Sequence, residues 1–398
     1  MGPVPELVGG VAWAVRAWVA MGRDPGAVKV VYVIDSLALG GAERSLVEMM
    51  PHLVRSGVDI TVAVLHDRAG LTGSARSAGA DVVTLAGDGH VARARSLRTL
   101  LGQIRPDVVH TTLFDADIVG RIAGRTARVP VTGSLVHNYG AEHRQPGVAG
   151  WKHRLASVAE ATTARACPQL HAVSPSVAAS ASRALRYPRE RITVVARGRD
   201  PLALGERTPE RRRAARLGLG IGDDTVVALL VGRQEHQKGF DRFLRSIPDL
   251  RLAFPRFEVR LAGPRGSATE AIRRAAVDVG IDPEVVLLGE RSDVAELLCA
   301  ADVFVLPSIS EGMPGALLEA MALEVPIVAR DIPAVRDVLE DGRHLVRGDT
   351  AWPEAIASSM GDGETIAGRR RRFGAHFTVE SSASQMIQFW AHLSDLPR

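Results

Sequence analysis

Cysteine and aromatic residues are scarce in this sequence. Only two of its 398 residues are cysteine, Cys167 and Cys299, which is too few for a disulfide framework and favours a reducing cytoplasm. Aromatic side chains make up 4% of the chain, so there is little stacking surface for single-stranded nucleic acid. We therefore expect neither a disulfide-stabilised secreted domain nor a nucleic-acid partner.

A large excess of one charge is also missing. The formal net charge is +4, from 49 basic and 45 acidic side chains. The basic residues gather in two arginine runs, at 211–216 and 369–372. Runs of this kind are most often solvated helix faces, and contact with anionic lipid or nucleic acid is the alternative.

The apolar stretch at residues 6–23 is too short to span a membrane, and Arg16 interrupts it. It lacks the basic start of a signal peptide. On a helical wheel its apolar side chains share one face with Arg16 opposite. We therefore predict an amphipathic extension, residues 1–28. It would lie either peripherally on the inner face of a membrane or against the protein itself.

Short β-branched runs alternate with helical periodicity from Lys29 onward, and they do so in two series. Residues 197–224, between the series, are polar and rich in glycine and arginine, which is typical of a linker. Apolar strands alternating with helices indicate parallel sheets covered on both faces. The sequence thus predicts an α/β protein of two facing Rossmann-like doubly wound domains with an inter-domain cleft. The expected segments are 1–28, the domains 29–198 and 199–375, and a C-terminal helix, 376–398.

A glycine loop follows the first predicted strand. Gly40 and Gly41 let the backbone approach a ligand closely, and the helix after them offers free N–H groups. No third glycine follows at the spacing of the dinucleotide fingerprint. An ordinary glycine turn is the alternative.

Two cations follow the first strand of the second domain. The stretch "VGRQEHQKGF" places Arg233 and Lys238 just after Gly232. An arginine offers a planar fork to phosphate oxygens and a lysine a mobile point charge. At the carboxyl edge of a sheet the two together favour an anion site over solvated surface positions.

Two carboxylates frame a later bend, "EGMPGALLEAM". Glu311 and Gly312 precede the predicted helix, in which Pro314 can take the first position, and Glu319 lies inside it. The separation is roughly 7 Å along the helix axis. Carboxylates accept hydrogen bonds from hydroxyl groups, so one could hold a sugar and the other a ribose. Solvated helix-end charges are the alternative.

These motifs together resemble the retaining glycosyltransferases with two facing Rossmann-like domains, the GT-B fold of family 4. The resemblance spans about residues 29–338. It implies that Glu311 contacts the donor sugar and Glu319 the ribose, while Arg233 and Lys238 neutralise the diphosphate. Gly40, Gly41, Gly232 and Gly312 would line the donor site. A nucleotide-diphosphate sugar is then the donor, bound by the second domain, and a sugar or lipid-linked hydroxyl group is the acceptor, bound by the first. Neither a cofactor nor a metal is expected.

The family also has a histidine beside the donor sugar. His137 in "GSLVHNYG" is the best match, and His110 in "DVVHTT" is the second candidate; a buried, satisfied histidine is the alternative for each. The pair Asp115 and Asp117 resembles a metal-binding carboxylate pair, but we interpret one of them as a helix cap.

The chain departs from the family pattern at two places. The stretch "ARGRDP" stands where the family often has Pro-Asn-Gly, so that Arg197 and Arg199 bring cations to the domain junction. Glu324 stands where the family usually has glycine.

The resemblance implies a hexosyltransferase-type reaction in polysaccharide, glycolipid or other glycoconjugate biosynthesis. A nucleotide-sugar epimerase or a sugar phosphorylase of the same fold is one alternative, because fold does not determine activity. A non-catalytic subunit that binds a nucleotide sugar is the other.

Overall fold

The structure is a computed structural model that describes residues 28–38, 40–68, 70–139, 150–282 and 286–396. The predicted extension at residues 1–28 lies, except for Val28, outside the described residues. None of the helices in the described ranges is long and apolar enough to cross a bilayer.

The first half of the chain forms a parallel sheet in the order β3-β2-β1-β4-β5-β6-β7. Its strands are β1 (Lys29–Ile34), β2 (Asp59–Val64), β3 (Asp81–Thr84), β4 (Val108–Thr112), β5 (Val131–Leu135), β6 (Leu170–Ala172) and β7 (Ile192–Val194). Its helices are α2 (Gly41–Arg55), α3 (Thr72–Ser77), α4 (Gly89–Ile104), α5 (Phe114–Ala127), α6 (Gly150–Ala164) and α7 (Pro175–Leu185). The strand order reverses between β1 and β4, which opens a crevice at their carboxyl ends.

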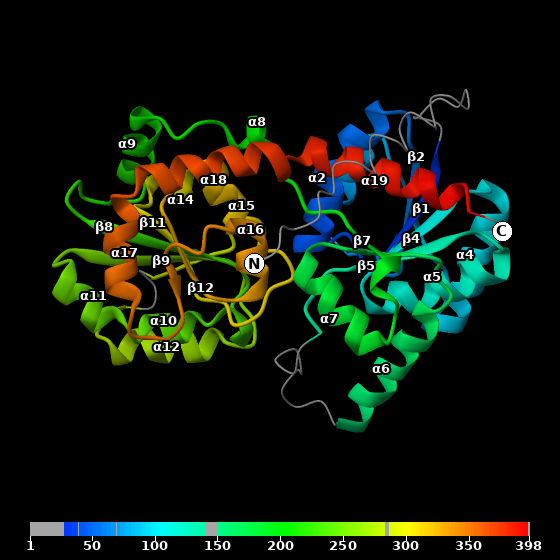
Figure 1. The fold of residues 1–398 in the computed structure, drawn as a ribbon, viewed down its shortest axis with the longest axis horizontal. Coiled ribbons are helices and arrows are strands. Elements are labelled where there is room, and N and C mark those ends of the chain that lie inside the picture. The colour runs from blue at the N-terminus through cyan, green and yellow to red at the C-terminus, as the bar shows by residue number, and fades with distance from the viewer. Residues whose placement is uncertain (1–27, 39, 69, 140–149, 283–285, 397–398) are drawn as a thin grey trace, which may run out of the picture.

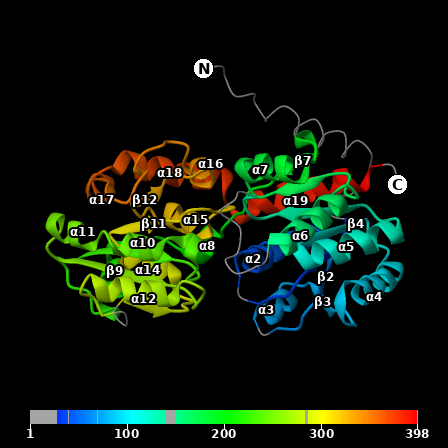
Figure 2. The ribbon, with the colours of Figure 1, turned by 90° about the horizontal axis from the view of Figure 1, so that it is seen from below.

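The second half forms a parallel sheet in the order β10-β9-β8-β11-β12-β13. Its strands are β8 (Val226–Val231), β9 (Phe257–Ala262), β10 (Leu287–Gly289), β11 (Val303–Leu306), β12 (Ile327–Arg330) and β13 (Leu345–Val346). Around it lie α8 (Pro201–Leu204), α9 (Pro209–Gly218), α10 (Phe240–Leu244), α11 (Ile247–Ala253), α12 (Thr269–Asp278), α14 (Val294–Ala300), α15 (Gly315–Ala322), α16 (Pro333–Leu339), α17 (Trp352–Met360) and α18 (Gly363–His376). The predicted fold class, two parallel α/β sheets of Rossmann-like type, is confirmed (Figures 1 and 2).

The last helix, α19 (Val379–Ser394), returns to the first domain, where it lies beside α2 (Figure 1). Its Met386, Phe389 and Trp390 pack into one apolar cluster with Leu46 and Met50 of α2. The chain therefore crosses between the domains twice, before α8 and before α19. The two crossings are paired, because Arg199 and Thr378 form an isolated parallel bridge.

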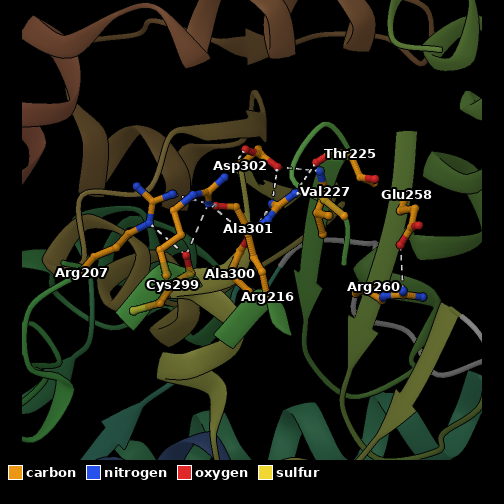
Figure 3. Close-up of polar contacts among 12 residues, drawn as sticks. Arg207, Arg216, Thr225, Val227, Glu258, Arg260, Cys299, Ala300, Ala301 and Asp302 are labelled. Carbon is orange, nitrogen blue, oxygen red and sulfur yellow. Dashed lines mark hydrogen bonds and ion pairs between the residues drawn. The ribbon is translucent and has the colours of Figure 1, made fainter. Parts of the chain in front are cut away.

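The prediction that the arginine runs are solvated is wrong for their buried members. Arg216 of α9 is 4% exposed and donates to the carbonyl oxygen of Ala300 and to Asp302, both at 3.1 Å (Figure 3). Arg207 donates to the carbonyl oxygen of Ala301 at 2.8 Å. These guanidinium groups donate hydrogen bonds to carbonyl oxygens at the C-terminal end of α14, where a helix presents free acceptors and a partial negative charge. In the second run, Arg369 is 3% exposed and pairs with Asp341 at 2.8 Å.

Candidate functional site: a cleft between the two sheets

A cavity of about 390 Å³ lies between the two domains. The glycine loop and Arg44 line it from the first domain, and Arg199 lines it from the crossover. The second domain contributes Gly232, Arg233, Gln237, Lys238, Arg291, Gly315 and Glu319, among other residues. Segments that are distant in sequence therefore meet at the carboxyl edges of the two sheets, where such folds bind ligands.

A smaller cavity of about 110 Å³ also lies between the domains and shares Gln237 with the first. Its wall includes His137 from the first domain and Glu311 and Gly312 from the second, together with Arg197. The structure therefore divides the predicted site residues between two compartments. Arg233, Lys238 and Glu319 line the large one, while Glu311 and His137 line the small one.

Lys238 joins the two compartments through an ion pair. Gly232 follows β8 with a φ of 152°, and a short 3-10 turn, His236–Lys238, then carries the lysine into the cleft. The Lys238 ammonium lies 2.6 Å from Glu311 Oε1, and Ser308 Oγ donates to the same oxygen at 2.7 Å. Arg233 lines the large cavity and is exposed. Of the two cations predicted from the sequence, Lys238 is thus already paired and Arg233 faces solvent.

Glu319 is held by arginines in a way that the sequence did not predict. It is 2% exposed, and its Oε1 accepts from Arg199 Nε at 2.9 Å and lies 3.3 Å from Arg44 Nη2. Both arginines come from outside the second domain's sheet, one from α2 and one from the crossover. A ribose at Glu319 would therefore share the carboxylate with these two cations or displace them.

The predicted glycines differ in what surrounds the position that a side chain would occupy. A side chain at Gly312 would place its Cβ 2.0 Å from the carbonyl oxygen of Val136, so Gly312 allows the two domains to touch here. Ser174 Oγ also donates to the Gly312 carbonyl at 3.0 Å across this contact. At Gly40 the flexible carboxylate of Glu43 fills the space of a side chain. Gly41 begins α2, whose free N–H groups face the large cavity.

His137 and His110 lie in different surroundings. His137 lines the small cavity with Glu311, and its ring lies 4.6 Å from that of Tyr139. His110 is 0% exposed, which is the alternative that the sequence left open. Its Nδ1 accepts from Trp390 Nε1 at 2.8 Å, and its Nε2 lies 2.6 Å from Ser134 Oγ. His110 therefore ties α19 to the first sheet and does not line the cleft.

The chain of hydrogen bonds continues beyond His110. Ser134 Oγ lies 3.0 Å from His171 Nδ1, and His171 Nε2 lies 2.9 Å from the carbonyl oxygen of Val195. A single direction satisfies every link: each Nε2 donates, each Nδ1 accepts, and both imidazoles are neutral. Burial agrees with this assignment, because it lowers the pKa of His171 to about 4 and holds the pKa of His110 well below its usual value.

The helix-cap interpretation of Asp115 and Asp117 is wrong. The residue before α5 is Leu113, whose side chain makes no capping hydrogen bond, and it is Asp35 Oδ1 that accepts from the Ala116 backbone N–H in the first turn, at 2.8 Å. Asp117 is buried and pairs with Arg121 at 3.0 Å, one turn along the same helix. Asp115 pairs with His90 at 2.9 Å at the surface. A hydrogen bond with His90 therefore accounts for Asp115, and an ion pair with Arg121 accounts for Asp117.

Three cleft residues, Arg44, Arg199 and Gln237, were not singled out from the sequence as site residues. Arg44 follows the glycine loop in the stretch "GGAER", three positions after Gly41, so that helical spacing brings it to the same end of α2. The sequence could have indicated Arg199, because a cation at the domain junction is unusual. It could not have indicated Gln237, since the position of Gln237 in both cavities depends on the fold of the turn.

Comparison with known families agrees with this architecture. Residues 39–201 match the family described as Glycosyltransferase Family 4, and residues 225–362 match Glycosyl transferases group 1. The two matches fall one on each side of the cleft, so the fold and the family comparison agree on two domains. The chain belongs to the family 4, group 1 glycosyltransferases.

Two groups of relatives illustrate the similarity. The D-inositol 3-phosphate glycosyltransferase of Stackebrandtia nassauensis is 31% identical over 221 residues, which are 52% of this chain and 47% of that protein. A UDP-Gal:alpha-D-GlcNAc-diphosphoundecaprenol alpha-1,3-galactosyltransferase of Escherichia coli is 29% identical over 242 residues, 60% of this chain and 61% of that one. The chain thus matches about half the length of the inositol phosphate relatives.

Solved structures share the fold over nearly the whole chain. Anabaena HepE, solved in complex with UDP and glucose, has a TM-score of 0.78 at 19% identity and covers 92% of this chain and 100% of its own. WaaG, a glycosyltransferase involved in lipopolysaccharide biosynthesis, has a TM-score of 0.69 at 16% identity and covers 90% and 99%. At these identities the likeness concerns the fold.

Proposed function

We propose that the chain is a retaining glycosyltransferase that moves a sugar from a nucleotide-diphosphate sugar to a hydroxyl acceptor. The observation that carries the proposal is the inter-domain cleft. There Arg233 and Lys238 lie at the carboxyl end of β8, and Glu311 and Glu319 approach from the next strand and helix of the same sheet. This arrangement supplies cations for a diphosphate and carboxylates for hydroxyl groups within one continuous site.

The large cavity suits the nucleotide and its diphosphate. Arg233 and Lys238 would neutralise the phosphate oxygens, together with the free N–H groups at the start of α2. Glu319 would accept from the ribose hydroxyls. Because Lys238 is already held 2.6 Å from Glu311, its ammonium can turn toward the phosphate without entering the cleft from solvent.

The small cavity suits the sugar and the reacting carbon. The bond between the anomeric carbon and the β-phosphate oxygen breaks, leaving negative charge on the phosphate and positive charge on the sugar ring. Lys238 and Arg233 stabilise the first, and Glu311 faces the second. The acceptor oxygen then bonds to the same face of the anomeric carbon, and its proton passes to the departing phosphate oxygen. Retention follows, and no protein general base is required.

This charge arrangement leads us to propose that turnover needs no divalent ion, since side-chain cations would perform the neutralisation. The test is turnover in the presence of a chelator, after dialysis. Full activity is expected. Complete loss that is restored by adding the ion back would contradict the proposal.

A peripheral membrane contact through residues 1–28 is also proposed, since an amphipathic segment would bring the cleft near a lipid-linked acceptor. Such an acceptor fits a role in polysaccharide, glycolipid or other glycoconjugate biosynthesis. Removal of residues 1–23 should release the protein from anionic vesicles in sedimentation and preserve activity on a soluble acceptor. Unchanged sedimentation would reject the membrane contact.

The proposed activity is tested with a panel of nucleotide sugars. A donor at 100 times its dissociation constant stabilises the protein by roughly 2.7 kcal/mol, which thermal unfolding detects. Product analysis with and without an acceptor then separates the alternatives. A transferase forms a glycoside only with the acceptor, whereas an epimerase converts the donor alone and a phosphorylase needs phosphate. Binding without turnover on any acceptor would favour a non-catalytic subunit.

A further inference from the structure

Arg197 is a cation in the small cavity that the proposed reaction does not use. It lies in the crossover after β7, where its backbone N–H donates to Met313 Sδ at 3.1 Å. Its side chain lines the wall that also holds His137 and Glu311. On its other side it borders a narrow pocket of about 50 Å³ that reaches Tyr32 and Thr112 of the first sheet. Arg197 therefore borders both the cavity that holds Glu311 and the first domain.

The guanidinium group of Arg197 is poorly neutralised. Within the part of the chain that the structure describes, it makes no ion pair within 4.0 Å, and the hydrogen bond that it donates, to the Met313 carbonyl, is long at 3.5 Å. Burial, and then the neighbouring Arg199, lowers the pKa of Arg197 to about 10, although Glu311 and Glu43 oppose this shift. Arg197 is only partly exposed, and a cation withdrawn from water is costly unless an anion accompanies it.

The neighbouring arginine shows the contrast. Arg199, two residues further along, pairs with Glu319 at 2.9 Å and with Glu48 at 3.1 Å. Both arginines flank Gly198, whose Cβ position is blocked by the Thr378 carbonyl at 2.3 Å. The backbone is thus clamped at this point, so that Arg197 is held at the cleft without a protein anion of its own.

We propose that the Arg197 guanidinium binds an anionic group, a phosphate monoester or a carboxylate, carried by the acceptor. Its planar fork suits the two oxygens of such a group. Arg197 lines the small cavity and not the large one that holds Arg233 and Arg291. Its Nη1 also lies 3.5 Å from the Cβ position of Gly41, which lines the large cavity. The guanidinium group therefore stands between the two compartments, and we place the anion of the acceptor on the small-cavity side. Bound there, it would hold the acceptor hydroxyl group beside the sugar at Glu311, so this inference rests on the proposed donor placement.

The binding test uses the full chain and inorganic phosphate as the probe. The nucleoside diphosphate that most stabilises the wild type, chosen from UDP, GDP and ADP, is first added to saturation. Phosphate is then titrated while thermal unfolding is followed, with Arg197→Met, Arg197→Lys and, as a control, Arg98→Met on the exposed face of α4. We expect phosphate to bind the Met variant at least tenfold more weakly, the Lys variant less so, and the control unchanged.

The kinetic test uses acceptors in matched sets: a neutral sugar, its monophosphate and its uronate. The wild type should prefer one anionic member at least tenfold in kcat/KM, and the choice between phosphate and uronate identifies the anion. In Arg197→Met the ratio of kcat/KM for the anionic acceptor to kcat/KM for the neutral one should fall toward one, because the KM for the anionic acceptor rises. Nucleoside diphosphate affinity should stay at the wild-type value.

Three results would overturn the inference. Equal use of neutral and anionic acceptors by the wild type would do so, as would an unchanged preference in Arg197→Met. A loss of nucleoside diphosphate affinity in that variant would assign the guanidinium to the donor. If Arg197→Met does not fold, Arg197→Lys decides, because a shorter cation at the same place should weaken anion binding alone. A wild type that binds no nucleoside diphosphate would refute the proposed function itself, and the inference with it.

Discussion

Arg199 and Glu319 form a buried ion pair in the cleft, with Arg199 Nε donating to Glu319 Oε1 at 2.9 Å and the two side chains 5% and 3% exposed. Arg199 also donates to Glu48 of α2 at 3.1 Å. One guanidinium group therefore links the first domain, the crossover and the helix that carries the proposed ribose ligand. This link ties Glu319 to both domains.

The strength of this link can be measured with a double-mutant cycle. Glu319→Gln and Arg199→Met should each lower the free energy of unfolding by about 1–3 kcal/mol, because each leaves a buried charge with only its second partner, Glu48 for Arg199 and Arg44 for Glu319. The double variant should lose less than the sum, by more than about 0.5 kcal/mol. Urea denaturation measures all four proteins. Additive losses would show that the pair contributes no coupling.

Glu311 and Glu319 should fail in different ways when each is changed to glutamine. Glu319→Gln should weaken the binding of free nucleoside diphosphate, because its carboxylate lines the large cavity. Glu311→Gln should leave that affinity nearly intact and lower the turnover number, since its carboxylate lies in the small cavity beside the reacting carbon. Calorimetric titration and steady-state kinetics on both variants check this. The reverse pattern would mean that the donor lies the other way round.

Lys238→Ala should slow sugar transfer by roughly a hundredfold, which is typical for the loss of one preorganised charge stabiliser. The fold should survive, because the residue lies on a turn at the cleft. Its removal also frees Glu311 from the ion pair of 2.6 Å. Arg98→Ala, which removes a cation far from the cleft, is the matched control. Kinetics like those of the wild type in Lys238→Ala would remove the lysine from the mechanism.

Acid should destabilise the protein through His171. Its pKa is about 4 in the folded chain because it is buried and about 6.5 when unfolded. Between these values the unfolded state binds more protons, so the free energy of unfolding falls as pH drops from about 6.5 to 4, by about 2–3 kcal/mol. Above pH 6.5 this contribution is constant. Urea midpoints from pH 7 to pH 4 should therefore fall more steeply for the wild type than for His171→Gln, and equal slopes would contradict the assignment.

Glu324 is the position at which the family usually has glycine, and the structure gives the reason. Its φ is 54°, in the left-handed region that favours glycine. Glu324→Gly should raise the free energy of unfolding by about 0.5–1 kcal/mol, because the relief of left-handed strain exceeds the entropy cost of glycine. Glu324→Gln is the control and should show no such gain. Destabilisation by glycine would indicate that the distant contact to Arg370, at 3.9 Å, matters more.

The sequence by itself determined the local elements and their approximate order around the cleft. Apolar runs separated by helical periodicity are short-range patterns, and a glycine turn or a proline at a helix start acts within a few residues. The strand–turn–helix segments that carry Arg233, Lys238, Glu311 and Glu319 were predicted for this reason. Parallel packing then brings the carboxyl ends of β8 and β11 to one edge, which the alternating pattern already implied.

Only the tertiary structure decided which charges meet. Glu319 pairs with Arg199 across 120 positions, and His110 bonds to Trp390 across 280. The neighbouring sequence does not distinguish Arg216, which is buried and donates to a carbonyl oxygen at the end of α14, from Arg213, which is exposed. An ion pair depends on a few ångströms between segments that pack independently, and local pattern carries no information at that scale. For this reason the sequence predicted the elements of the cleft, and the fold decided how its charges are shared.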